Sequence, residues 1–245
     1  MALEATHVRF ALALLPKLNI QDIVAYCSGA VYPDTRYVTG IERTVTHGPD
    51  CPHDPFAEGL TDFERGWASH LFYDRYEGER IRGLMSSEIG PVERSTRAWI
   101  EMSAMKVVED MVSVPKMGDD LRHIRELAID AAPRGENVDL IRRHFFITAD
   151  LYASTCSLED YMTWIREVGA DNEIVVAMRS RVDEFLKDDV LKGKIEEIFE
   201  EKQIDIFNIR DRVRNAGLKV LLRMLVLGAH VKYQANRQSN QNKNS

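Results

Sequence analysis

The segments GAVYPD (residues 29–34), TH (46–47) and GWASHLFYD (66–74) carry side chains that are able to bind a metal ion. His70 and Asp74 are four residues apart, a spacing that places both on one face of a helix. Asp34 follows Pro33 at the expected end of a helix, and His47 lies between these two regions. Imidazole nitrogens combined with carboxylate oxygens suit Zn²⁺, Fe²⁺ or Mn²⁺ better than Mg²⁺ or Ca²⁺. The segments therefore predict that separate parts of the chain meet around a divalent cation.

Each of these residues also has an ordinary alternative role. Asp34 can form a turn or cap a helix, and His47 can be an exposed loop histidine. His7, which lies in the first turn of an expected helix, can be a surface residue. A pair such as His70 and Asp74 also occurs by chance. Only the combination of these residues favours a metal site.

The rest of the chain predicts an all-α fold, a multi-helix bundle around this site. Apolar residues recur at helical spacing, and no segment shows the strict alternation of a strand. One helix is expected to begin near Phe56 or Asp62 and to continue past Asp74. The other expected helices cover residues 3–15, 20–29, 91–113, 118–131, 137–153, 158–168, 171–187, 190–213 and 216–233.

Helix ends are expected at Pro16, at Gly29 with Pro33, and at Pro115. Residues 35–55 show little periodicity and contain several Gly and Pro residues, which predicts an irregular segment that serves a site. Residues 1–234 are expected to form a single metal-binding domain. The polar residues 235–245 are expected to be disordered.

Composition excludes several classes of function. The net charge of −7 argues against broad binding to nucleic acid, which requires clustered positive charge. The N-terminus lacks the basic region of a signal peptide, and no apolar run is long enough to span a membrane. The scattered Cys27, Cys51 and Cys156 do not suggest a disulfide framework. We therefore expect a cytoplasmic protein.

The order of His7, GAVYPD, TH and G-x-x-x-H-x-x-x-D resembles the zinc-dependent phospholipase C family, and more distantly the S1/P1 nucleases. The resemblance covers about residues 4–76 and is that of a divergent member of the bacterial type. It implies an all-helical fold with a zinc cluster that cleaves phosphodiester bonds. It also implies that Asp34, His47, His70 and Asp74 bind one metal ion. His7 would then bind a neighbouring ion, with Asp74 as the bridge.

The chain departs from the family pattern after this region. Family members with a full cluster have a further His pair and a Glu, but residues 75–122 contain no histidine. Glu101, His123 with Glu126, or His144 would complete a second site only if the fold returns them to it. We therefore expect one or two ions.

The resemblance implies a metal-dependent hydrolase of phosphoric ester bonds, with a small phosphate-ester or phospholipid-like substrate. Asp34 or Asp74 would orient the attacking water and accept its proton. Arg36, Arg43 and Arg75 lie next to the expected ligands and are candidate phosphate partners, with surface solvation as their alternative.

A non-catalytic helical interaction protein with a structural or degenerate metal site is the alternative function. A closed ligand shell without a cleft would distinguish this alternative. Self-association through residues 190–232, which gives a homo-oligomer, is a further possibility.

Overall fold

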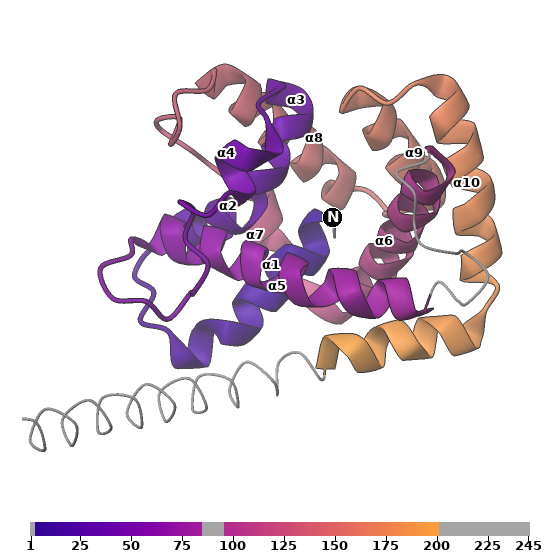
Figure 1. Ribbon diagram of the computed structural model, residues 1–245, viewed down its shortest axis with the longest axis horizontal. Coiled ribbons are helices and arrows are strands. Elements are labelled where there is room, and N and C mark those ends of the chain that lie inside the picture. The colour runs from indigo at the N-terminus through magenta and orange to yellow at the C-terminus, as the bar shows by residue number, and fades with distance from the viewer. Residues whose placement is uncertain (1–2, 85–95, 201–245) are drawn as a thin grey trace, which may run out of the picture. The chain divides into compact units, whose positions relative to one another are not determined.

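The computed structural model describes residues 3–84 and 96–200, and it gives side-chain surroundings for residues 3–75 and 97–200. This part of the chain is all-α, a multi-helix bundle with no β-strand (Figure 1). The first elements are α1 (Glu4–Leu14), η1 (Leu15–Lys17), α2 (Ile23–Val31), η2 (Tyr32–Thr35), α3 (Arg36–Thr39), α4 (Arg43–His47) and α5 (Asp62–Leu84). They are followed by α6 (Thr96–Met117), η3 (Gly118–Leu121), α7 (Arg122–Arg125), α8 (Val138–Ala153), α9 (Leu158–Glu167), α10 (Asn172–Leu186) and a helical segment over residues 189–200.

Helices α2 and α5 form the most extensive helix pair, and two glycines allow their backbones to approach closely. A Cβ atom added at Gly29 would lie 1.9 Å from the carbonyl oxygen of Phe63. One added at Gly66 would lie 1.8 Å from the carbonyl oxygen of Tyr26. The prediction that Gly29 ends the helix was wrong, because α2 continues to Val31 and Gly29 serves the contact with α5.

We expect Gly66→Ala to destabilise the fold by about 3 kcal/mol or more, because the backbones of α2 and α5 must separate. Urea unfolding with the slope m unchanged is the measurement. Gly193→Ala is the matched control, since a Cβ at this helical position would contact nothing within 4 Å. It is expected to stabilise by about 0.5–1 kcal/mol. Equal effects of the two substitutions would contradict the close approach.

Helices α1, α8 and α9 lie where the sequence predicts them. Helix α9 begins with a capping box in which Ser157 and Asp160 exchange side-chain-to-backbone hydrogen bonds. Other predictions were wrong. The segment 35–55 contains the short helices α3 and α4. Gly40 follows the end of α3 and has a φ of 72°, which suits a glycine. Pro115 lies inside α6, and only η3 and α7 occupy the helix expected over residues 118–131.

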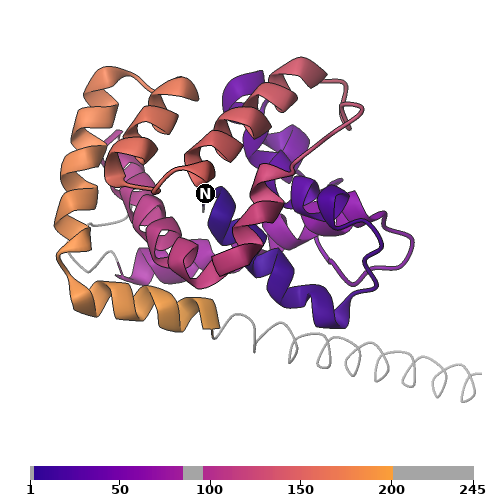
Figure 2. The same ribbon diagram turned by 180° about the vertical axis from the view of Figure 1, so that it is seen from behind.

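The described residues belong to one compact unit with a continuous apolar core that extends from α1 and α2 to α10. Helix α6 packs against α1 and α10, and α8 contacts α3, α7 and α9. In the view from behind, α8 is followed by α9 on the side of the bundle that faces the reader (Figure 2). Most of the helix predicted over residues 190–213, the helix over 216–233 and the polar tail lie outside the described residues. The expected extent of the domain, 1–234, therefore stays a prediction.

Within residues 3–84 and 96–200, none of the helices combines the length and apolar character that a membrane span requires.

Candidate metal centre

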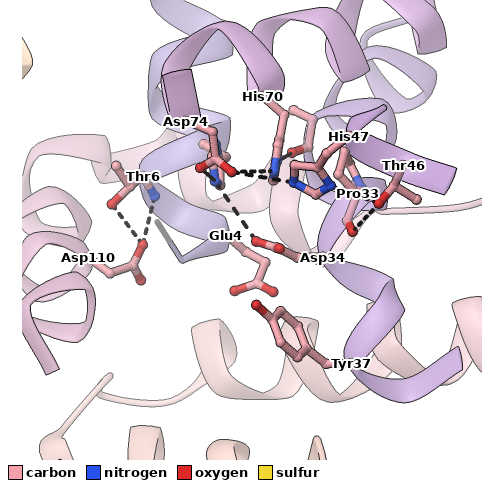
Figure 3. Close-up of polar contacts among 12 residues, drawn as sticks. Glu4, Thr6, Pro33, Asp34, Tyr37, Thr46, His47, His70, Asp74 and Asp110 are labelled. Atoms are coloured by element: carbon pink, nitrogen blue, oxygen red, sulfur yellow. Dashed lines mark hydrogen bonds and ion pairs between the residues drawn. The ribbon is translucent and has the colours of Figure 1, made fainter. Parts of the chain in front are cut away.

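Five predicted ligands meet in the structure, although they come from four different elements (Figure 3). His7 lies on α1, Asp34 on η2, His47 at the end of α4, and His70 and Asp74 on α5. Ligand atoms of His7, His70 and Asp74 lie within 4.8 Å of one another, as do those of Asp34, His47 and His70. His70 is common to both groups and therefore lies at the middle of the cluster.

The two carboxylate oxygens of Asp74 face different imidazoles. Oδ2 is 3.4 Å from Nε2 of His47 and 3.8 Å from Nε2 of His70. Oδ1 is 3.7 Å from Nε2 of His7, which is also 4.0 Å from Oδ2 of Asp34. Asp74 therefore presents one carboxylate oxygen to His7 and the other to His47 and His70.

These separations suit ligands of a small divalent cation. Atoms that lie about 2.0–2.2 Å from a tetrahedral Zn²⁺ are roughly 3.3–3.6 Å from one another. The distances from Asp74 to His47 and His70 are close to this range. The buried Nε2 of His70 and Oδ1 of Asp34 have no hydrogen-bond partner among the residues that the structure describes, which is costly unless a ligand satisfies them. Nitrogen and oxygen donors of this kind fit the predicted Zn²⁺, Fe²⁺ or Mn²⁺.

The ring of His70 is oriented by the neighbouring helix. Its Nδ1 lies 2.8 Å from the carbonyl oxygen of Ala30 on α2, which accepts its hydrogen bond. The proton is thereby placed on Nδ1, and the lone pair of Nε2 faces the cluster. The ring also stacks on that of His7, with centroids 3.6 Å apart. The close contact of α2 and α5 therefore determines the orientation of a central ligand.

Thr46 orients the ring of His47 in the same way. The Thr46 hydroxyl lies 3.3 Å from the carbonyl oxygen of Pro33, to which it donates, and 2.8 Å from Nδ1 of His47. Since the hydroxyl proton points to Pro33, the hydroxyl oxygen accepts from Nδ1 and leaves Nε2 as the ligand atom. The carbonyl oxygen of Thr46 in turn accepts a hydrogen bond from Nε1 of Trp67.

We expect Thr46→Val to weaken metal binding about 10–100-fold, the usual cost of losing a partner that orients a ligand. Valine keeps the shape of the buried Thr46 but cannot fix the proton on Nδ1 of His47. Competition with a chromophoric chelator measures the affinity. The control is Thr44→Val, which changes an exposed threonine on the same short helix. Equal affinities of the two variants would contradict the role of Thr46.

The electrostatic environment favours the metal-binding protonation states of His47, His70 and Asp74, whereas it opposes ionisation of Asp34. Burial lowers the pKa of His47, and burial together with the neighbouring His7 lowers the pKa of His70 well below its usual value. Burial opposes ionisation of Asp74, yet the neighbouring side chains of His47, His70 and His7 help to hold its pKa well below the usual range. Burial and the charge of Asp74 raise the pKa of Asp34 to about 7. Neutral imidazoles and an ionised carboxylate are the forms that bind metal ions.

A buried network positions the first turn of α1, which carries His7. The residue before this helix is Leu3, which has no side chain that can cap it. Instead, the backbone N–H of Thr6 donates to Oδ1 of Asp110 on α6 at 2.7 Å, and that of Ala5 donates to the hydroxyl of Tyr152 at 3.2 Å. Two N–H groups that have no partner within their own helix are satisfied in this way.

The cluster borders a pocket with a volume of about 280 Å³. Asp34, His47 and Asp74 line it on the side of the ligands. The other lining side chains include three cations, an aromatic phenol and an indole, namely Arg36, Arg43, Lys106, Tyr37 and Trp99. The guanidinium of Arg43 lies 3.4 Å from Oδ2 of Asp74. The candidate ligands are therefore accessible from a space that also contains positive charge.

Sequence reasoning missed two polar residues near the ligands, Glu4 and Tyr37, whose side chains point toward each other in the neighbourhood of Asp34 (Figure 3). Oε1 of the buried Glu4 lies 3.0 Å from Nε2 of His144, and its Oε2 has no hydrogen-bond partner in the described part of the chain. Glu4 lies three residues before His7, so the two share a helix face, and this spacing could have indicated Glu4 from the sequence.

The other candidates for a second site lie elsewhere. Glu101 forms ion pairs with Arg97 and Arg181, and His123 pairs with Glu126 at 3.8 Å. None of these belongs to the groups of potential ligands found among the described residues. His144 contacts Glu4 and is not in those groups either. The exposed Arg75 does not line the pocket, so the geometry favours its alternative role at the surface.

Comparison of the chain with models of protein families, with curated proteins and with solved structures found no match.

Proposed function

We propose that this protein is a metal-dependent hydrolase of phosphoric ester bonds, similar to a phosphodiesterase or phospholipase C. The observation that carries the proposal is the convergence of three imidazoles and two carboxylates at the wall of a pocket. Zn²⁺ fits this donor set, and Fe²⁺ or Mn²⁺ are compatible with it. The order of these ligands in the chain is also that of the zinc-dependent phospholipase C family.

The residues around the pocket suit this chemistry. A divalent cation held by His7, Asp34, His47, His70 and Asp74 would polarise a phosphoryl oxygen and lower the pKa of a nearby water molecule. Asp34 and Asp74 line the pocket, where a carboxylate can orient an attacking water molecule and accept its proton. Arg36, Arg43 and Lys106 place positive charge where a phosphate group would lie. A small phosphate ester or phospholipid-like molecule is therefore the proposed substrate.

The pocket also bears on the alternative of a structural or degenerate metal site in an interaction protein. A purely structural ion is held in a closed shell of protein ligands, whereas a catalytic ion keeps an open position. Here three of the candidate ligands line a pocket of about 280 Å³. This accessibility favours the hydrolase over the interaction protein.

Elemental analysis of the full-length protein, followed by an assay with a generic phosphodiester, tests the proposal. We expect at least one Zn²⁺, Fe²⁺ or Mn²⁺ ion per chain and turnover that a chelator abolishes and the same ion restores. A protein that holds the ion but hydrolyses neither phosphodiesters nor phosphomonoesters would support the structural role instead.

A further inference from the structure

A second cavity adjoins the pocket at the candidate metal centre. Its volume is about 280 Å³, and it shares Tyr37, Trp99, Ser103 and Lys106 with that pocket. A molecule bound at the metal centre could therefore extend past these shared residues into the second cavity. The elements that enclose this cavity are mainly α6, α9 and α10, which lie outside the part of the chain that resembles the phospholipase C family.

The walls of the second cavity are largely apolar. Trp164 and Ile165 come from α9, Ile174 and Met178 come from α10, and Val168 lies at the end of α9. The indole of Trp99 on α6 borders both cavities and is 41% exposed, unusual for so large an apolar side chain. Burial of such surfaces against a ligand is favourable by about 25 cal/mol per Å².

A single charged side chain of the described residues lies where the two cavities meet. Lys106 is only 3% exposed and lines both of them. An anionic group near Lys106 would share the pocket with the candidate metal ligands Asp34 and His47. Beyond Lys106, Asp171 is the only charged side chain that lines the second cavity among the described residues. The junction suits a phosphoryl group, and the cavity suits an uncharged substituent.

We propose, on the basis of the function proposed above, that the second cavity binds an aromatic substituent of the phosphoester substrate. Its volume is nearly twice the roughly 150 Å³ of an apolar cavity that binds benzene, which is enough for a fused two-ring group. The rings of Tyr37, Trp99 and Trp164 favour a flat aromatic group, which can stack on them, over a flexible chain. The substrate class is thus an aryl or arylalkyl phosphoester with its phosphoryl group next to Lys106.

Three phosphonates that cannot be hydrolysed test this inference, with the metal-loaded full chain and titration calorimetry. They carry a methyl, an octyl or a 2-naphthylmethyl group. We expect the naphthylmethyl compound to bind about tenfold or more tightly than the methyl compound, from the apolar surface that it buries. The octyl compound should bind less tightly than the naphthylmethyl compound.

Ile174→Trp fills the cavity and should remove the advantage of the naphthylmethyl compound. Val176→Trp is the matched control, because Val176 lies on the same helix and is 67% exposed. The Val176→Trp variant should retain the tenfold difference in affinity between the naphthylmethyl and methyl compounds. Val168→Trp is a second filling variant in case Ile174→Trp does not fold by circular dichroism. Equal binding of the three phosphonates, tighter binding of the octyl compound, or no effect of a folded filling variant would overturn the inference.

The compound 2-naphthylmethanol separates this inference from the proposed function, because it has no phosphoryl group. Binding of this alcohol that Ile174→Trp abolishes and Val176→Trp preserves would support an aromatic site even if the protein held no metal. Failure of the alcohol and of the naphthylmethyl group to bind, in a protein that still hydrolyses small phosphodiesters, would overturn the aromatic site and leave the hydrolase intact.

Discussion

Replacing His70 by alanine abolishes both metal binding and phosphoester hydrolysis, if the proposed function is correct. His70 belongs to both groups of potential ligands, so every placement of an ion in this cluster loses a ligand. The effect should exceed the roughly 10–100-fold that follows from the loss of an orienting partner. Metal content after dialysis against buffered Zn²⁺, and turnover of a chromogenic phosphodiester, are the two measurements.

His123→Ala is the control for this experiment. His123 is also a histidine on a helix, but it pairs with Glu126 and belongs to neither ligand group. Its substitution should leave metal content and turnover unchanged. Retention of a full complement of ions by the His70 variant would contradict the metal centre. Turnover that survives with no ion bound would contradict the metal-dependent mechanism but not the cluster itself.

The position of the cluster could be predicted because local rules determine much of it. His70 and Asp74 share a helix face at a spacing of four residues, and Asp34 follows the predicted helix in the short element η2. His47 lies in a segment whose Gly and Pro content predicted an irregular chain that serves a site. The short helices α3 and α4 within that segment were missed, since helices of four or five residues depend on tertiary contacts.

The surroundings of the cluster could not be predicted, because they depend on residues far apart in sequence. Thr6 and Asp110 are separated by 104 positions, and Glu4 and His144 by 140. Gly29 has the composition signal of a helix end, but the close approach of α5 explains its presence within α2. Neither helical periodicity nor capping signals contain information on such contacts, which only the packed structure determines.

Asp110→Asn should destabilise the protein by about 2–4 kcal/mol, although the two side chains have the same size. Both carboxylate oxygens of Asp110 accept hydrogen bonds: Oδ1 from Thr6, and Oδ2 from the hydroxyls of Tyr152 at 2.5 Å and Tyr161 at 2.7 Å. The asparagine side chain has one acceptor oxygen, so its NH₂ group would face either Thr6 or the two tyrosine hydroxyls, which are hydrogen-bond donors themselves. Burial raises the pKa of Asp110 to about 7, while these donors stabilise its ionised form.

Urea unfolding measures the loss, with Asp139→Asn as the control. Asp139 has a side chain that is 81% exposed and pairs with Arg142 across one helical turn, so its substitution should change stability by less than about 0.5 kcal/mol. Equal unfolding midpoints for the two variants would show that the Asp110 network does not stabilise the fold.

Because Asp110 also holds the first turn of α1, which carries His7, its asparagine variant should bind metal more weakly under conditions where it remains folded. A folded Asp110 variant with unchanged metal affinity would mean that the ligands are held in place without this support.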